Sequence, residues 1–336
     1  MKTFYSYSPL LTMATALLFQ TPAAIAQSSD EEDLASIYGD KSTVSIATGS
    51  QQPLRRAPSV TTVITAEDIA AIGATDLDDV METVPGMHVS RSVMYTPLYI
   101  MRGIGTNPND SRMLMLQNGI PVTTMFLGDK GQNWGGLPLE NIARIEIIRG
   151  PGSALYGADA FAGAINIITK TAADISGTEF GVRGGTFNTW DGWVQHGGKL
   201  GAVDVAAYLR VGSTDGAHDI ITADAQTKRD AVFHTQASLA PGPIHTGRDA
   251  LDGSLDLSYD KWRLRTGYKL RDNLGVGAGV AFALDPKGLH KSERLNSDLS
   301  WTDTQVAKDW GMGVTASYLH YSETLASNYQ LSPPRR

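Results

Sequence analysis

Residues 144–170, RIEIIRGPGSALYGADAFAGAINIITK, constrain the fold more than any other part of the chain. The first six residues alternate, so Ile145 and Ile147 are expected to face a core and Glu146 to point away from it. A Gly-Pro-Gly sequence then interrupts the strand, and an apolar strand resumes at 164–169. Glycines that need a positive φ or a close approach to another surface are expected at Gly150, Gly152, Gly157 and Gly163. The segment therefore predicts a compact strand, turn and strand unit.

The composition excludes several classes of protein and site. The 336 residues contain no cysteine, which rules out cysteine nucleophiles and thiolate metal sites. A formal net charge of -7 without a basic stripe argues against a general affinity for nucleic acid. The sequence lacks the serine-hydrolase, zinc-protease, dinucleotide and P-loop motifs, and its seven histidines are scattered without ligand spacing. We therefore expect no enzyme, no resident metal and no cofactor.

The N-terminus has the pattern of a secretory signal. Lys2 precedes an apolar run at 10–19, and the Ala-Ile-Ala sequence at 24–26 supplies the small residues of a signal-peptidase site. A run of about ten apolar residues is too short for a membrane-spanning helix, which needs about 20. We expect residues 1–26 to be a signal peptide and the mature chain to begin at Gln27.

Residues 27–58 have the composition of a flexible arm. The stretch starts with acidic residues, contains Pro53 and Pro58, and carries one short β-rich piece, TVSIAT, at 43–48. Two interpretations of this piece stay open. It is either a strand that pairs with another protein or the first strand of the domain that follows. The arm is too short for an additional signalling domain.

Residues 59–172 predict a small domain that mixes helices and strands. Thr65 is expected to cap a helix that Gly73 ends, and Thr75 or Asp76 to cap a second helix that stops at Pro85. A first strand is expected at 60–64. The strands expected to complete one small sheet lie at 98–102, 113–117, 142–148 and 164–169.

After residue 170 the sequence alternates with a period of two. The clearest case is a hairpin with a two-residue turn at 260–261, which would place Asp256 opposite Arg265 and Asp252 opposite Lys269. One face of this hairpin is apolar and the other is ionic. Such a face pattern is typical of outer-membrane strands, although a soluble β-sandwich also shows alternation.

Aromatic residues and loop lengths favour the membrane interpretation. Tyr259 and Trp262, at the closed end of the hairpin, resemble an interfacial aromatic girdle. The longer connections, at 215–248 and 273–290, alternate with short ones, as outer loops alternate with periplasmic turns. With the hairpin, about seven strands are expected, the others at 178–184, 189–196, 203–211, 293–301 and 311–321.

Residues 144–170 resemble the end of the plug domain of TonB-dependent outer-membrane receptors, where an Arg-Gly-Pro turn precedes Ser-Ala-Leu-Tyr-Gly and a Gly-x-Ile-Asn-Ile-Ile-Thr-Lys strand. Similar blocks occur in the expected order, with SVTTVITAEDI at 59–69, VPG at 84–86, MRGIG at 101–105 and a block at 113–122. In this last block the family more often has an acidic residue where the chain has Asn118; Asn-Gly forms the same tight turn. The residues matching the plug motif are Gly103, Gly119, Glu146, Gly150, Pro151, Tyr156, Gly157, Gly163 and Asn166.

The resemblance implies an α+β plug domain at 59–172, followed at 173–336 by an antiparallel transmembrane β-barrel. A plugged barrel has about 22 strands, and at about ten residues each these need roughly 220 residues. The residues after the plug are fewer. We therefore expect an incomplete barrel with about seven of the roughly 22 strands, from a truncated gene model, a frameshift or a split gene.

The resemblance also implies a function and partners. It predicts a receptor of the cell outer membrane, in contact with outer-membrane lipid, that imports a scarce ligand using energy delivered by TonB with ExbB and ExbD. A ferric siderophore is the expected ligand. Cobalamin or another ligand is the alternative to a siderophore. The alternative to transport is a fragment that binds a ligand or another protein without transport, or a decayed remnant without function.

Arginines of the plug are expected to lock it in place. By the resemblance, Arg102 and Arg149 match plug arginines that face glutamates on the inner barrel wall, with partners on strands beyond residue 336. The alternative is a solvated ladder of Arg144, Glu146 and Arg149 within the plug.

Two further sets of site residues follow from the resemblance. The TonB box, which pairs with TonB by strand addition, is expected at Thr43, Val44, Ser45, Ile46, Ala47 and Thr48, with 33–38 as the alternative. Ligand is expected to meet Tyr95, Phe126 and Trp134, although turn formation and plug packing explain these aromatic residues almost as well.

Overall fold

The computed structural model describes residues 60–326, apart from gaps at 93–94, 105–111, 123–135, 153–155, 280–281 and 309. Before residue 60 it describes only Thr43, Val44, Ile46, Gln52 and Pro53. The signal peptide predicted at 1–26 and the start of the mature chain at Gln27 lie outside the described residues. Among the described residues, no helix is long and apolar enough to cross a membrane.

The plug domain is built around a five-stranded sheet in the order β3-β8-β9-β6-β7. The three strands β3, β8 and β9 pair antiparallel, and β6 runs parallel to β9. The strands span Thr61–Thr65 (β3), Met113–Gln117 (β6), Ile120–Pro121 (β7), Ile142–Arg149 (β8) and Gly163–Thr169 (β9). Four of the predicted plug strands are thereby confirmed, with boundaries that shift by one residue or less at most ends.

One predicted plug strand belongs elsewhere. Among the described strands, Pro97–Met101 (β5) pairs with Met87–Arg91 (β4), in a separate two-stranded sheet. The prediction that 98–102 would join the main sheet was therefore wrong. An apolar run identifies a buried strand without identifying the partner strand, and the β4 strand, which was not expected, supplies that partner.

Two short helices connect β3 to β4. Helix α2 spans Ala66–Ile72, capped by Thr65 and ended by Gly73 at φ 72, and α3 spans Leu77–Glu82, capped by Asp76. Both N-caps form capping boxes, because the cap side chain accepts from a backbone N–H that the helix leaves unpaired. These caps are those that the sequence predicts. The helices cover the β8 and β9 face that carries the buried residues Ile145, Ile147, Ile165 and Ile167.

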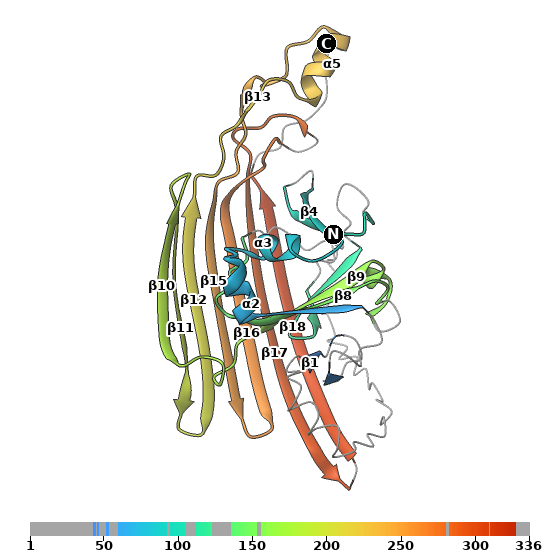
Figure 1. The fold of residues 1–336 in the computed structure, drawn as a ribbon. Helices are drawn as coiled ribbons and strands as arrows, with labels where there is room; N and C mark the ends of the chain where they lie inside the picture. The colour runs from blue at the N-terminus through green and yellow to red at the C-terminus, as the bar shows by residue number, and fades with distance from the viewer. Residues whose placement is uncertain are drawn as a thin grey trace, which may run out of the picture.

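Between Gly177 and Leu325 the described residues form a seven-stranded antiparallel sheet, which we call the wall (Figure 1), in the order β10-β11-β12-β15-β16-β17-β18. Its strands span Gly177–Gly185 (β10), Thr189–Leu200 (β11), Val203–Thr214 (β12), Arg248–Tyr259 (β15), Trp262–Gly275 (β16), Leu289–Ala307 (β17) and Trp310–Leu325 (β18). All seven predicted strands are confirmed, and most are longer than the alternation suggested. Within the described residues, β10 and β18 each pair on one side only, so the barrel is not closed.

The register of the wall sorts its side chains onto two faces. Tyr259 lies opposite Trp262, and Trp262 lies opposite Trp301, so aromatic residues gather beside the 260–261 turn. The same outward face carries a band of exposed apolar side chains, as a lipid-facing surface requires: Phe180, Val182, Val194, Leu209, Val211, Leu295, Leu299, Met312, Val314 and Tyr318. The opposite face carries Asp191, Arg210, Asp252, Lys269 and Arg271 and contacts the plug.

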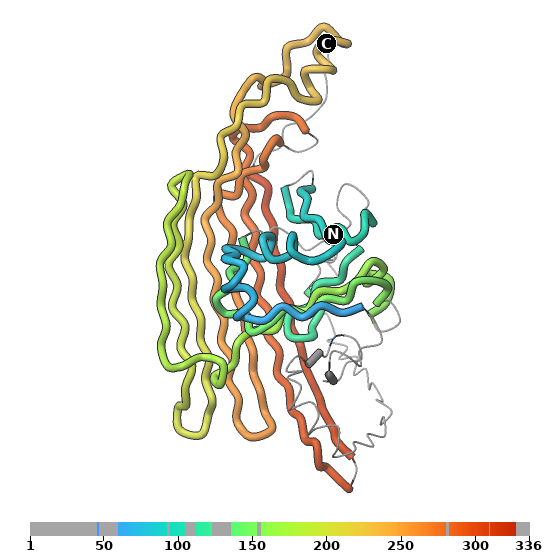
Figure 2. The backbone as a smooth tube through the Cα atoms, in the orientation of Figure 1, coloured from blue at the N-terminus to red at the C-terminus, as the bar shows by residue number. Residues whose placement is uncertain are grey.

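Both long connections lie at one end of the wall, together with the short turn at 186–188, and the turns at 201–202 and 260–261 lie at the other end (Figure 2). The segment 215–247 contains helix α5 (Ala225–Phe233) and the short pair β13 (Ile220–Ile221) and β14 (Gly242–Pro243). It projects past the strands at the top of the view. The second long connection is 276–288. This asymmetry is the one that the sequence predicts.

The glycines of the 144–170 stretch behave as predicted. Gly150, Gly157 and Gly163 have φ values of 145, 76 and 156, and a Cβ at Gly152 would lie 3.3 Å from the Ala160 Cβ. At Gly163 both constraints combine, because a Cβ would also lie 2.2 Å from the Ile148 carbonyl oxygen.

Gly163→Ala is expected to destabilise the plug by about 1–3 kcal/mol more than Gly150→Ala. Both substitutions meet a positive φ, but nothing lies within 4 Å of a Cβ at Gly150. Urea unfolding, followed by tryptophan fluorescence of both variants, measures the difference. Equal destabilisation would show that the close approach of β9 to β8 is absent.

Candidate functional site

The centre of the charged face is the carboxylate of Asp252 on β15. It is 1% exposed and contacts three cations. Its Oδ1 accepts from Lys269 Nζ at 3.1 Å and from Arg271 Nη2 at 3.0 Å, and its Oδ2 accepts from Arg210 Nη1 at 3.2 Å. Lys269 lies directly opposite on β16, as the hairpin prediction required, and Arg210 lies opposite on β12. Three partners keep this buried carboxylate ionised.

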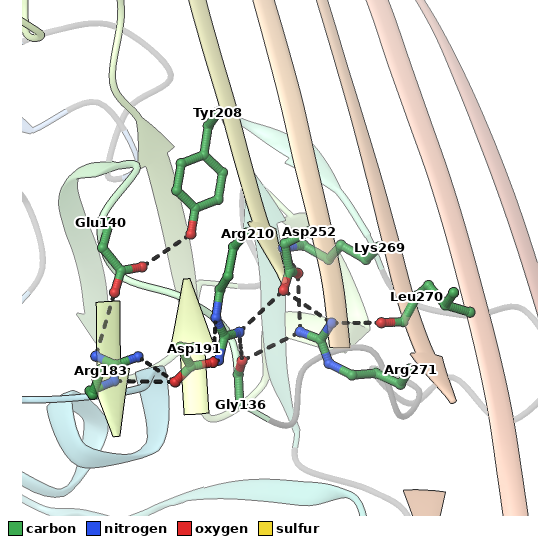
Figure 3. Close-up of polar contacts among 10 residues, drawn as sticks. All are labelled: Gly136, Glu140, Arg183, Asp191, Tyr208, Arg210, Asp252, Lys269, Leu270 and Arg271. Carbon is green, nitrogen blue, oxygen red and sulfur yellow. Dashed lines mark hydrogen bonds and ion pairs between the residues drawn. The ribbon is translucent and has the colours of Figure 1, made fainter. Parts of the chain in front are cut away.

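The ion pairs continue across the neighbouring strands (Figure 3). Arg210 Nε donates to Asp191 Oδ1 at 3.0 Å, and Arg183 Nη2 donates to Asp191 Oδ2 at 3.0 Å. These contacts run from β10 to β16 without a break. We call the set Arg183, Asp191, Arg210, Asp252, Lys269 and Arg271 the wall network.

The second half of the predicted hairpin ladder differs in detail. Asp256 lies opposite Arg265 in the register, as predicted, but its ion pair is with Arg263 at 2.5 Å. Arg265 instead contacts Asp298 on β17 at 2.7 Å. Asp298 lies directly opposite Arg265, whereas Arg263 reaches Asp256 as a diagonal neighbour, as long side chains in a sheet can.

The wall network contacts the plug through the loop before β8. The Gly136 carbonyl accepts from Arg210 Nη1 at 2.9 Å and from Arg271 Nη2 at 3.4 Å (Figure 3). Glu140 accepts from Tyr208 at 3.1 Å and from Arg183 Nη1 at 3.5 Å. Two neutral plug side chains also contact the wall, since Asn141 contacts Ser254 at 3.3 Å and Gln117 contacts Arg294 at 2.6 Å.

Gly136 fits this position because it has no side chain. Its φ is 60, and a Cβ there would lie 2.3 Å from Nη2 of Arg248. Three wall arginines therefore surround one plug residue. Gly136 is not among the predicted site residues, although the Gly-Gly-Leu-Pro sequence at 135–138 is a signal of special backbone geometry.

On another face of the plug, Ile46 of the arm is anchored to β8. Its N–H donates to Glu146 Oε2 at 3.0 Å, and its carbonyl accepts from the Tyr156 hydroxyl at 2.9 Å. Its side chain is 1% exposed and packs in a cluster with Leu116 and Ile148. Burial, with the Glu146 carboxylate nearby, raises the pKa of Tyr156, so this hydroxyl keeps its proton and donates.

Glu146 itself corrects two expectations. It lies on the β8 face opposite Ile145, as the alternation predicts, but its exposure is 0% because Ile46 covers it. The alternative of a solvated ladder was also wrong for this residue. Arg144 Nε donates to the buried carboxylate at 3.0 Å, whereas Arg149 Nη1 donates to the Pro85 carbonyl at 3.4 Å.

The predicted latch arginines have no wall partner among the described residues. Arg102 is exposed, with φ 51, and its N–H donates to the Gly86 carbonyl at 2.6 Å. Arg149 contacts Pro85 on the plug. The latch therefore stays a prediction.

The remaining predicted residues divide into described and undescribed ones. Gly119 donates its N–H to Asn166 Oδ1 at 2.9 Å, which joins two plug-motif residues across the sheet. Thr43–Val44 (β1) pairs with Gln52–Pro53 (β2) and not with the plug sheet. Tyr95 packs on Gly277 of the wall. Outside the described residues lie Ser45, Ala47, Thr48, Phe126 and Trp134.

Comparisons with known proteins agree with this architecture. Residues 53–164 match the family model described as TonB-dependent Receptor Plug Domain. The vitamin B12 transporter BtuB of Vibrio vulnificus (strain CMCP6) is 35% identical over 130 residues, 38% of this chain and 20% of that protein. The iron-regulated outer membrane virulence protein of Vibrio cholerae (strain O395) is 34% identical over 171 residues, 49% of this chain and 24% of that protein.

Solved structures share the fold at low identity. The siderophore receptor PiuA from Acinetobacter baumannii aligns with a TM-score of 0.58 at 16% identity, over 85% of this chain and 39% of that one. BauA, the ferric preacinetobactin receptor of the same species, aligns with a TM-score of 0.57 at 17% identity, over 85% and 41%. The chain spans about a quarter or less of the length of the two Vibrio proteins named above. Residues 53–164 thus carry the plug domain of the TonB-dependent receptors, and the strands that follow share the fold of the barrel wall in the solved receptors.

Proposed function

We propose that the chain forms the plug and the first wall strands of a receptor that imports a ferric siderophore by TonB-coupled transport. The observation that carries the proposal is the form of the plug interface, in which a wall with its own ion pairs holds the plug through a few polar contacts. Iron-regulated and siderophore receptors among the similar proteins support the choice of ligand. The vitamin B12 transporters support cobalamin as the second candidate.

The interface is suited to release of the plug. Arg210 and Arg271 keep Asp252 as a partner when the Gly136 carbonyl leaves, and Arg183 keeps Asp191 when Glu140 leaves. Each of these wall residues therefore keeps a charged partner when the plug separates. A buried charge left without a partner would cost several kcal/mol. Water can replace the lost hydrogen bonds to the plug, so each contributes only about 0.5–1.5 kcal/mol.

The contacts of Ile46 with Glu146 and Tyr156, which we call the arm anchor, connect the arm to the plug sheet. Glu146 lies within β8, which pairs with both β3 and β9, so a pull on Ile46 acts directly on the centre of the plug sheet. In this proposal TonB, energised by ExbB and ExbD, pairs by strand addition with the arm at 43–48. Arg102 and Arg149 remain proposed latch residues toward later wall strands.

Uptake of radioactive iron supplied as ferric enterobactin, and of labelled cyanocobalamin, tests the proposal in cells that carry the intact locus. Uptake of the iron chelate is expected to require TonB and to be lost when residues 27–50 are deleted. TonB-dependent uptake of cyanocobalamin alone would select the second candidate. Binding of either compound without uptake would contradict transport and leave a binding protein.

Asp252→Asn is expected to destabilise the folded wall by about 3–5 kcal/mol, because it leaves Arg210, Lys269 and Arg271 buried without their shared carboxylate. The heat-induced change in gel mobility that marks folded outer-membrane proteins measures it. Asp303→Asn is the matched control, since its partner Lys261 is 44% exposed and the pair is solvated. Equal effects of the two variants would contradict a central role for Asp252.

Tyr156→Phe is expected to loosen the arm without unfolding the plug, since it removes one hydrogen bond to the Ile46 carbonyl. A single cysteine at Ser45, in a chain that has none, should then react with a maleimide about two- to tenfold faster. Tyr208→Phe, which removes a hydroxyl at the wall interface instead, should leave the rate unchanged. An unchanged rate in Tyr156→Phe would contradict the anchor.

A further inference from the structure

The two long connections of the wall are joined by their backbones. The Gly277 N–H donates to the His245 carbonyl at 2.7 Å, and the His245 N–H donates to the Gly277 carbonyl at 3.2 Å. Next to this bridge, the Gly275 N–H donates to the Gly247 carbonyl at 2.9 Å. The segments 215–247 and 276–288 are therefore connected where each leaves the sheet.

A second connection lies farther from the sheet, at the carboxylate of Asp224. Its Oδ1 caps helix α5 by accepting from the Thr227 N–H at 2.7 Å, and its Oδ2 accepts from the Leu284 N–H at 2.8 Å. The Leu284 side chain is 0% exposed and packs on Gly242, where a Cβ would lie 2.8 Å from Leu284 Cδ2. With two points of attachment, the two segments form one body, which we call the long-loop unit.

The long-loop unit contacts the plug through the ring of Tyr95. A Cβ at Gly277 would lie 2.5 Å from Tyr95 Cδ2, so the ring packs directly on the glycine backbone. Tyr95 has φ 64 in a tight turn, where its N–H donates to the Ser92 carbonyl at 2.9 Å. The guanidinium of Arg91 lies 5.7 Å from the ring centre on the plug side. The Tyr95 ring therefore contacts the Gly277 backbone in the long-loop unit and the Arg91 guanidinium in the plug.

From Arg91 the contacts continue into the plug core. Its Nη2 donates to Asp78 Oδ2 at 2.6 Å, and Asp78 Oδ1 accepts from the Tyr99 hydroxyl at 2.8 Å. Asp78 lies in helix α3, and Tyr99 is fully buried. A continuous set of contacts therefore runs from the long-loop unit through Tyr95 to α3.

We propose that Tyr95 couples the long-loop unit to helix α3, so that a ligand that displaces the two loops also displaces the plug. The inference rests on the proposed function, and Tyr95 acts in it as a positioning residue. A ligand shifts such an equilibrium only through different contacts in the two states. Contiguous contacts alone do not establish coupling, so the test perturbs one end and observes the other.

The test is hydrogen–deuterium exchange of the full chain in lipid nanodiscs, without ligand. Asp224→Ala, which removes the carboxylate contact to Leu284, should raise exchange at least about threefold in 276–288, in 91–99 and in α3. Asp230→Ala is the matched control. Asp230 accepts from Thr235, Ala237 and Ser238 within the same loop, so its loss should loosen only 224–240.

Substitutions at the contact itself decide whether Tyr95 carries the effect. In a Tyr95→Ala background, Asp224→Ala should raise exchange in 276–288 but cause no further rise in α3, whereas Tyr95→Phe should behave as wild type. Gly277→Ala, which displaces the ring without touching Asp224, should raise exchange in α3 directly. The proposal is overturned if Asp224→Ala and Gly277→Ala loosen the loops and leave α3 unchanged. Because no ligand is present, this result is independent of uptake.

Discussion

The structure depends on a buried carboxylate that three cations share. Asp252 sits 1% exposed on the charged face of the wall, in contact with Arg210, Lys269 and Arg271. Strict alternation places these residues on one face and the apolar band on the other, so the interaction exists only in the correct register. A shift by one residue would turn the charges toward lipid, where each arginine or lysine costs about 2–4 kcal/mol near the midplane. The ion cluster thus fixes the register, and the register fixes the surface that receives the plug.

The plug meets that surface with groups that carry little charge. A backbone carbonyl at Gly136 and the amides of Gln117 and Asn141 contact wall side chains, and within the described residues the acidic contact is made by Glu140. The charges of the wall network are paired within the wall, so the plug is held there mainly by hydrogen bonds that water can replace. A stable wall and a removable plug are compatible for this reason. The arm is likewise held at Ile46 by few contacts, namely two hydrogen bonds and the burial of one apolar side chain.

The sequence predicted local and periodic features well. The helix caps Thr65 and Asp76, the two-residue turn at 260–261 and the pairing of Asp252 with Lys269 depend on neighbours or on a period of two, and all are confirmed. The failures are non-local. Nothing near Glu146 in sequence indicates that Ile46, 100 residues away, covers it. The partner of β5 depends on which strands pair, and the contact of Arg263 with Asp256 depends on how far the arginine side chain reaches. Gly136 contacts arginines from three other strands, which no local pattern indicates.

Formation of an engineered disulfide between the plug and the wall tests most directly whether the plug is held against this part of the wall. Asn141 and Ser254 meet through their side chains at 3.3 Å, and the chain has no cysteine of its own. Asn141→Cys with Ser254→Cys should cross-link under mild oxidation in membranes, giving a faster-migrating band that reduction abolishes. Asn141→Cys with Ser300→Cys, on the distant strand β17, should not cross-link. Absence of the first cross-link, or equal formation of both, would contradict a plug held against this part of the wall.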